Sequence, residues 1–299
     1  MESRKVITKP TLEEDKSHGT HGFPFQIYRE NYRQYPMGVM DLHWHRELEL
    51  DLVTDGTAIF KAGDQTCLLE KGDGIFVNSN LLHLARAGDL TKNTEHVAIL
   101  FAPEFLAPAD SDIFREEVKP FLEDQRTGCV VLSGKIPWQR EILRLARSAV
   151  EQFEGRIREW KLEVHVDICQ IWQLLVREVT QEGHAGGNLA MQERTRQMLA
   201  YIREHYGESI SVEDLAEAAG ISRSECFRCF QRFVGQKPFA YINSYRLMQA
   251  AKLLRTTDLS VCEVGIRCGF NYQSYFGKMF REAYGQTPFA YRKNGGCSG

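Results

Sequence analysis

The sequence predicts a multidomain chain with a β-barrel and a pair of helices in its N-terminal part and an all-α C-terminal part. Three observations predict this division. Short apolar runs separated by Gly/Asp turns fill residues 24–102, a pattern typical of a sandwich or barrel. Two apolar patterns with helical spacing follow between residues 137 and 181. A seven-residue motif then recurs near the C-terminal end, and 299 residues are enough for two domains.

The predicted strands are short and lie close together. The segment 48–53 (Leu-Glu-Leu-Asp-Leu-Val) alternates apolar and acidic residues, which is the period of a strand with two different faces. Turn signals follow at Asp55-Gly56, Gly63-Asp64 and Gly72-Asp73-Gly74. The remaining apolar runs between these turns are residues 57–60, 66–69, 75–77 and 96–101.

Two helices are predicted at residues 137–153 and 160–181. In the first, Trp138, Ile142, Leu145 and Ala149 recur at three- and four-residue steps, and the second carries a broader stripe that includes Ile168 and Trp172. One helix of this pair can pack on the barrel while the other faces a partner, or both can belong to an internal core. The Gly-rich segment after Gln181 is typical of a flexible linker.

The charge is distributed unevenly along the chain. The whole sequence has 37 basic and 40 acidic residues, but residues 192–299 hold 15 basic and only 10 acidic ones, so the C-terminal part is positive. Such an asymmetry indicates a nucleic-acid-binding module. No apolar stretch approaches the ~18 residues of a membrane span and residues 1–10 lack the apolar core of a signal peptide, so we expect a cytoplasmic protein without a membrane partner. The eight scattered cysteines, including Cys226 and Cys229, are interpreted as free, buried thiols.

The recurring motif marks an internal duplication. Gly235-Gln-Lys-Pro-Phe-Ala-Tyr241 matches Gly285-Gln-Thr-Pro-Phe-Ala-Tyr291 at six of seven positions, 50 residues apart. Each copy follows two short helical segments. Capping signals begin these segments at Ser211 with Asp214, Ser222 with Glu225, Ser260 with Glu263, and Asn271. Gly220, Gly235 and Gly269 can end helices in the left-handed conformation.

A helix, a Gly-containing turn and a second helix make a helix-turn-helix unit, and two such units on a basic segment are a strong signal for DNA binding. A connecting helix is predicted from Pro238 to about Arg255. At 1.5 Å per residue it is about 27 Å long. It can therefore hold the two second helices about one DNA turn (~34 Å) apart, in successive major grooves.

Residues 192–293 resemble the DNA-binding domain of AraC/XylS-type transcription regulators. The resemblance rests on G-I-S-R-S-E-C-F-R-C-F at 220–230, on Tyr245-Arg246 followed by Ala250-Ala251-Lys252-Leu253-Leu254, and on Gly269-Phe270 with Ser274-Tyr275-Phe276. Both copies of the repeated motif belong to the same pattern. The family places two helix-turn-helix units on DNA, and in it the arginine at the position of Arg246 is mainly architectural.

The resemblance also implies base-reading positions. In the first recognition helix they are Ser224, Phe227 and Arg228. In the second they are Gln273, Ser274, Gly277 and Lys278. Arg228 has the chemistry to bind guanine and Gln273 to bind adenine, whereas Phe227 suits thymine methyls or the core equally well. Gly277 can contact DNA only through its backbone or by close approach. Phosphate contacts, or merely solvated charges, are expected at Arg223, Arg232, Lys237, Arg281 and Arg292.

The N-terminal part resembles the cupin-like sensor domain that precedes AraC-type DNA-binding domains. His43-Trp44-His45, Glu49 and the later His83 match the H-x-H, glutamate and histidine of cupin enzymes, which bind a metal there. The second motif departs from the enzymes because no proline lies between Gly72 and His83. We therefore expect His43, Trp44, His45, Glu49 and His83 to bind a small effector without a metal or other cofactor. The alternatives are that the two histidines of H-x-H, Glu49 and His83 bind Mn, Fe, Ni or Zn, or that they only lock the strands.

These signals predict a ligand-responsive, sequence-specific transcription regulator that is not an enzyme. Its effector is expected to be a small molecule, with a sugar or sugar derivative as one candidate class. Its partners are expected to be promoter DNA, RNA polymerase and a second copy of the chain. The rival hypothesis is a metal-dependent cupin enzyme fused to a DNA-binding domain. The predicted organisation is an N-terminal arm (1–23), a cupin-like sensor (24–130), a helical dimerisation segment (131–182), a linker (183–191), the DNA-binding domain (192–293) and a tail (294–299).

Overall fold

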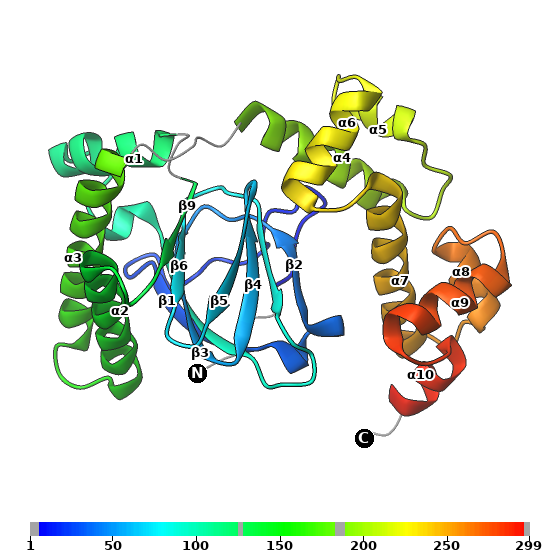
Figure 1. Ribbon diagram of the computed structural model, residues 1–299, viewed down its shortest axis with the longest axis horizontal. Helices are drawn as coiled ribbons and strands as arrows, with labels where there is room; N and C mark the ends of the chain where they lie inside the picture. Colours follow the sequence, from blue (N-terminus) through cyan, green and yellow to red (C-terminus); the bar gives the residue numbers. More distant parts are fainter. Residues whose placement is uncertain (1–5, 125–127, 183–188, 296–299) are drawn as a thin grey trace. The chain divides into compact units, whose positions relative to one another are not determined.

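The computed structural model describes residues 6–124, 128–182 and 189–295, and the chain divides into two compact units, Met1–Gln192 and Glu193–Gly299 (Figure 1). The predicted linker, residues 183–191, is described only from Leu189, where helix α4 already begins. The first unit contains the strands β1 (Phe25–Asn31), β2 (Val39–His43), β3 (Leu48–Asp55), β4 (Thr57–Ala62), β5 (Gln65–Glu70), β6 (Gly74–Val77), β7 (His83–Ala87), β8 (Glu95–Phe101) and β9 (Cys129–Leu132), and the helices α1 (Lys119–Glu123), α2 (Pro137–Gly155) and α3 (Trp160–Glu182).

The strands form two antiparallel sheets that face each other, as predicted. One sheet has the order β1-β8-β3-β6-β9 and the other the order β2-β7-β4-β5. Side chains from both sheets, among them Val53, Ile75, Phe60 and Ala85, share one buried cluster, which is the interior between the sheets. Strand β9 crosses the predicted boundary at residue 130, so the five-stranded sheet continues two residues into the segment assigned to the helices.

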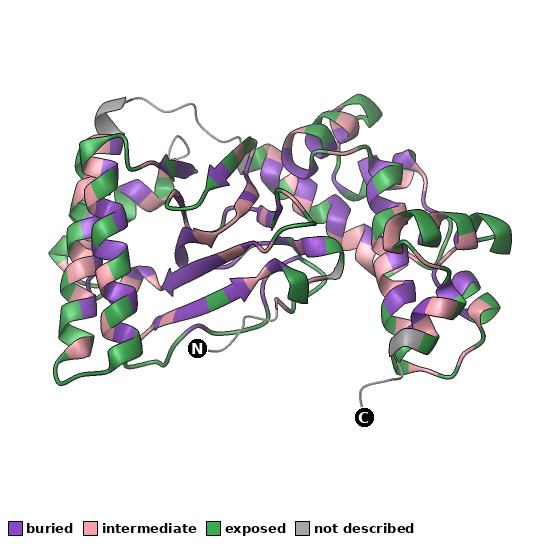
Figure 2. Ribbon diagram, turned by 60° about the horizontal axis from the view of Figure 1, so that its bottom comes forward, coloured by how far each residue is buried: buried purple, intermediate pink, exposed green. Residues whose placement is uncertain are grey.

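The alternation of β3 divides its side chains between two different environments. Leu48, Leu50 and Leu52 pack outward into a cluster with α2 and α3, including Ile142 and Ile168. The acidic residues between them therefore point into the interior of the barrel, and β3 is buried on both faces. The helices α2 and α3 cover the outer face of the five-stranded sheet and keep an exposed face of their own (Figures 1 and 2).

An N-terminal segment packs against the barrel near the end of β2. Leu12 is fully buried, and its carbonyl accepts a hydrogen bond from the backbone of Trp44. The backbone of Glu14 donates back to the carbonyl of Trp44. No local pattern predicts this segment, because its contacts are made with Trp44, which lies far from it along the chain.

The second unit contains two helix-turn-helix units joined by a long helix. Its helices are α4 (Leu189–His205), α5 (Val212–Ala218), α6 (Arg223–Cys229), α7 (Pro238–Thr256), α8 (Val261–Arg267), α9 (Gln273–Tyr284) and α10 (Pro288–Gly295). The predicted capping boxes at Ser211, Ser222 and Ser260 are all formed. The first recognition helix continues beyond α6 as a π-helical turn from Phe230 to Val234 and ends at the left-handed Gly235.

One predicted cap is wrong. The residue before α9 is Tyr272, its side chain makes no capping hydrogen bond, and Asn271 lies one residue too early to serve. The predicted interpretation of the cysteines in the first recognition helix is supported, because Cys226 and Cys229 are buried and burial raises the pKa of Cys226 to about 11. Among the described helices, none combines the length and hydropathy that a bilayer crossing requires.

Two equivalent glycines end the first helix of each helix-turn-helix unit, and they differ in their surroundings. Both have a positive φ, +60° at Gly220 and +77° at Gly269. A Cβ at Gly220 would meet nothing within 4 Å, whereas one at Gly269 would lie 2.6 Å from the carbonyl of Tyr206 and 2.9 Å from the Arg246 guanidinium.

We therefore expect Gly220→Ala to cost about 1–2 kcal/mol, which is the left-handed strain alone. Gly269→Ala should cost about 3 kcal/mol or more, because overpacking adds to that strain. Calorimetry of the full chain, following the transition of the C-terminal unit, measures both variants. Equal losses of stability would contradict the packing described for Gly269.

Candidate functional site: a buried histidine–glutamate centre and two exposed recognition helices

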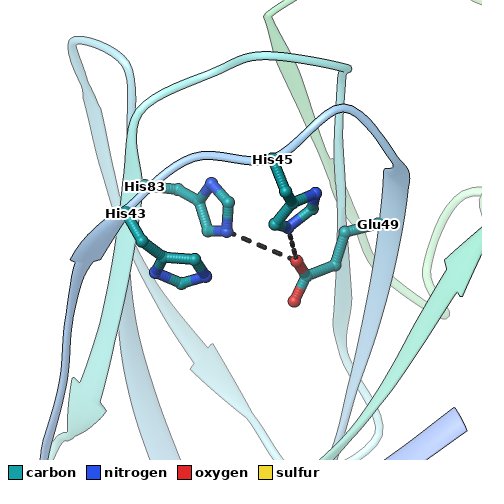
Figure 3. A group of neighbouring side chains, drawn as sticks. All are labelled: His43, His45, Glu49 and His83. Atoms are coloured by element: carbon teal, nitrogen blue, oxygen red, sulfur yellow. Dashed lines mark hydrogen bonds and ion pairs between the residues drawn. The ribbon is translucent and has the colours of Figure 1, made fainter. Parts of the chain in front are cut away.

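The four residues of the predicted set converge at one end of the barrel (Figure 3). His43 ends β2, His45 follows in the turn, Glu49 is the second residue of β3, and His83 begins β7. All four are buried, with at most 3% of any residue exposed. One donor atom from each lies within 4.8 Å of the others, and no other group of three or more potential metal donors occurs in the described part of the chain. We call this set the histidine–glutamate centre.

Each imidazole is held by a hydrogen bond to a backbone carbonyl two residues away. Nδ1 of His43 lies 2.8 Å from the carbonyl oxygen of Asp41, Nδ1 of His83 lies 2.8 Å from that of Leu81, and Nδ1 of His45 lies 3.1 Å from that of Glu47. A carbonyl oxygen can only accept, so each Nδ1 carries a proton and donates it. In a neutral ring the lone pair is then on Nε2.

The carboxylate of Glu49 faces two of these rings. Its Oε2 atom lies 2.6 Å from Nε2 of His45 and 3.3 Å from Nε2 of His83. Two lone pairs at such a distance repel each other, so a shared proton or a metal ion must lie between the carboxylate and the ring.

The donor set fits a divalent transition metal. Three imidazole nitrogens and one carboxylate are ligands that suit Mn, Fe, Ni or Zn, and burial excludes competing water. The carbonyls that hold each Nδ1–H are the outer partners that orient metal-bound histidines. A bound metal would supply a fixed positive charge and a Lewis acid at this end of the barrel.

Trp44, the fifth residue of the predicted effector set, is engaged elsewhere. Its indole Nε1 donates to the carbonyl of Thr11 at 2.9 Å, and its backbone pairs with the N-terminal segment. The same segment brings His18 and Glu14, which sequence reasoning missed, to the edge of the centre. They form a buried pair at 3.2 Å, and the His18 ring lies 5.8 Å from that of His45.

The first recognition helix presents its predicted base-reading residues to solvent. Ser224 and Arg228 are exposed and lie four residues apart on one side of α6, while Phe227 is half-buried. Arg228 keeps two thirds of its side chain exposed and lies 3.9 Å from Glu225. Arg223 pairs with Glu213 at 3.1 Å, and Arg232 lies over the ring of Phe233. These two cations flank the exposed side rather than forming part of the core.

The second recognition helix has an equivalent exposed side. Gln273, Ser274 and Lys278 are exposed, and Gly277 between them is half-buried. A Cβ at Gly277 would meet nothing within 4 Å, so the core does not require glycine there. A shallow pocket of about 610 Å³ adjoins this side and is lined by residues that include Lys278, Arg281 and Pro288.

Two arginines hold backbone carbonyls together inside the unit. Arg246 donates to the carbonyls of Tyr206 at 2.8 Å and Glu208 at 2.6 Å, which supports its predicted architectural role. Arg292 donates to the carbonyls of Leu254 at 3.2 Å and Leu259 at 2.5 Å. The sequence suggested a phosphate contact or a solvated charge for Arg292, and the structure gives it this architectural role instead.

Comparison with known proteins matches both units. Residues 31–199 match the AraC-like ligand binding domain, and residues 215–294 match a helix-turn-helix domain. An uncharacterised HTH-type transcriptional regulator of Bacillus subtilis, YdeC, is 28% identical over 97% of this chain and 99% of its own. The HTH-type transcriptional activator RhaS of an Enterobacter species is 26% identical over 85% of this chain and 87% of its own. A regulator structure from Chromobacterium violaceum with an AraC-type DNA-binding domain is 28% identical, covering 38% of this chain and all of that one, with a TM-score of 0.35.

Gly277 offers a direct test of the second recognition helix. Replacing a glycine inside a helix by alanine in open space should stabilise the fold by about 0.5–1 kcal/mol. If DNA approaches the backbone closely at this position, the same methyl group should weaken DNA binding at least tenfold. Thermal unfolding and DNA titration of Gly277→Ala measure the two effects, with Gly134→Ala in the other unit as the control. Unchanged DNA affinity would contradict a close approach at Gly277.

Proposed function

The chain belongs to the AraC-type transcription regulators, and on this premise we propose that it is a ligand-responsive regulator whose barrel binds a small effector and whose second unit reads promoter DNA. The observation that carries the proposal is the pairing of a buried polar centre in one unit with two exposed recognition helices in the other. No catalytic role is needed for either unit.

The DNA-binding face consists of the exposed residues of α6 and α9. Ser224, Arg228 and Phe227 read bases from the first helix, and Gln273, Ser274 and Lys278 read bases from the second. Arg223 and Arg232 bind phosphates beside the first helix. α7 has 19 residues and is therefore about 28 Å long, which suits two helices that enter successive major grooves.

A second copy of the chain is the proposed partner of the helical pair. Leu162 and Val166 lie four residues apart on α3 with 62% and 41% of their surfaces exposed, and Ile157 just before this helix is 68% exposed. Exposed apolar groups in one region indicate an interface. A homodimer would place two DNA-binding units on one promoter, where RNA polymerase is the further expected partner.

The effector acts through differential affinity. A small molecule held in the barrel, for which a sugar or sugar derivative is the candidate class, stabilises the arrangement of the chain that it binds more tightly. His43, His45, Glu49 and His83 are the proposed effector contacts at the mouth of the barrel. The proposal places the protein in the cytoplasm, where promoter DNA is found.

A metal-dependent enzyme joined to the same DNA-binding unit is the second candidate function. The specific observation that favours it is the donor set of three oriented imidazoles and one carboxylate. In this alternative the residues of the centre would hold the metal through Nε2 and the carboxylate, and the N-terminal segment would exclude water from it.

Arg228→Ala tests base reading by the first helix. We expect specific binding to weaken by about 1–3 kcal/mol, with base preference relaxed at one position, because an arginine–guanine contact is lost. Titration against the preferred site and its single-base variants measures this. The matched control is Arg115→Ala, whose side chain is 62% exposed in the other unit. An equal loss on all sequences would assign Arg228 to phosphate.

Metal analysis tests the second candidate function. If a metal belongs to the centre, protein purified without added metal should contain about one Mn, Fe, Ni or Zn ion per chain. The ion should be lost on His45→Ala and kept on His205→Ala, which changes a partly exposed histidine of α4. Metal-free wild-type protein would exclude the metal-dependent enzyme and leave the effector-binding interpretation.

A further inference from the structure

We propose that Tyr272, the residue before the second recognition helix, is a specificity-determining residue whose ring contacts the 5-methyl group of a thymine. This inference rests on the proposed function, because it assigns a further base-contacting residue to the second helix-turn-helix unit. It goes beyond the four predicted base-reading positions of α9, none of which carries an aromatic side chain.

The internal duplication pairs Tyr272 with a serine. The two copies of the repeated motif lie 50 residues apart, and the same offset pairs Tyr272 with Ser222. It also pairs Tyr275 with Glu225. The structure agrees with this pairing, because Ser222 is the N-cap of α6 and Tyr272 is the N-cap of α9. The two positions form a capping box in the first unit and hold two tyrosines in the second.

The tyrosine at the N-cap does not serve the stability of α9. A serine there accepts a hydrogen bond from a backbone N–H of the first turn, as Ser222 does in α6, whereas the side chain of Tyr272 makes no capping hydrogen bond. The side chain of Tyr272 is also 72% exposed. Within the described part of the chain it forms no hydrogen bond, ion pair or ring contact. Its contribution must therefore come from outside the unit.

Tyr275 shows the contrast, because the unit uses the side chain of this second tyrosine. The hydroxyl oxygen of Tyr275 accepts a hydrogen bond from Nδ2 of Asn243 in α7 at 3.3 Å. Its ring lies 6.3 Å from the ring of Phe270, which is buried in the turn between α8 and α9. Tyr275 thus joins the recognition helix to the rest of the unit, and Tyr272 is the tyrosine that is left for a partner.

The position of Tyr272 identifies DNA as this partner. In helix-turn-helix units the N-terminal residues of the second helix contact base edges. Tyr272 directly precedes Gln273 and Ser274, which are both exposed and are both predicted to read bases. The exposed ring is therefore continuous with the proposed DNA-binding face of α9.

The chemistry of the ring favours thymine among the four bases. The 5-methyl group of thymine is the apolar group that a base presents in the major groove, and apolar side chains contact it there. The polar edge of another base would lose water against the ring without gaining a hydrogen bond from it. The hydroxyl group of Tyr272 could instead donate to a phosphate, but that contact carries no sequence information.

The test uses the full chain and a binding site selected from random duplex DNA. Each thymine of this site is replaced in turn by deoxyuridine, which removes only the 5-methyl group. We expect at least one replacement to weaken binding of the wild type about fourfold, which corresponds to the ~0.8 kcal/mol of one buried methyl-sized group. Tyr272→Ser should lose the discrimination at that position, and Tyr272→Phe should keep it.

Two further measurements separate this result from a loss of fold. Tyr272→Ser places at the N-cap of α9 the residue type that caps α6, so this variant should unfold at the wild-type temperature or above it. Leu90→Ser removes an apolar side chain that is 68% exposed in the first unit, and this control should keep the wild-type discrimination.

Each outcome bears on the proposal. A wild type that binds every deoxyuridine site as tightly as the thymine site overturns the methyl contact. Discrimination that persists at every position in Tyr272→Ser overturns the assignment to this residue. Its loss in Tyr272→Phe overturns the ring contact in favour of the hydroxyl group. Failure to select any specific site would count against the proposed function, whereas a specific site without discrimination that depends on Tyr272 counts against this inference alone.

Discussion

The structure of the first unit depends on the alternation of β3, which sends three leucines outward and two carboxylates inward. The leucines pack α2 and α3 on the sheet, and this packing fixes which face of the strand becomes the interior. Glu49 and Asp51 are therefore buried in the interior of the barrel. Burying an ion costs several kcal/mol unless partners compensate, so the surrounding elements must supply them. His45 and His83 do so for Glu49, and His96 does so for Asp51. An interior built only for stability would more simply be apolar, and this cost is the physical reason to regard it as a binding site.

The second unit differs from the first in where its polar side chains lie. Apolar packing stabilises it, and the polar side chains proposed to bind DNA lie on its surface. Phe276 and Phe280 of α9 are fully buried, while the predicted base-reading side chains occupy the opposite side of the helix. Capping boxes start α5, α6 and α8 at defined residues, and the buried apolar side of each recognition helix fixes its rotation about its axis. That rotation decides which side chains face DNA. The excess of basic residues in this part of the sequence supplies the phosphate attraction, while the acidic excess of the first unit is partly buried in the barrel.

The features that could be predicted from the sequence are those marked by short-range signals or by the internal repeat. The capping serines, the terminating glycines and the duplicated motif are short-range signals, and the helices they delimit were predicted nearly to the residue. The convergence of His43, His45, Glu49 and His83 was predicted only because the set resembles a known pattern. The inward position of Asp51 could have been found from the same alternation that revealed Glu49, since both lie on one face of one strand.

Other features depend on contacts that no local pattern encodes. His96 meets Asp51 through strand pairing across the sheet, and the N-terminal segment packs on Trp44 far along the chain. Arg292 was misjudged because its carbonyl partners lie more than 30 residues away.

The central claim is that the barrel interior is an arranged ligand centre, with each Nδ1 tied to the backbone and each Nε2 directed at a bound group. Long-range ¹H–¹⁵N correlation of the histidine side chains in the full chain tests this most directly. The account predicts that His43, His45 and His83 all carry a proton on Nδ1, which donates to the backbone carbonyl beside it. Neutral rings that carry their only proton on Nε2 would contradict it.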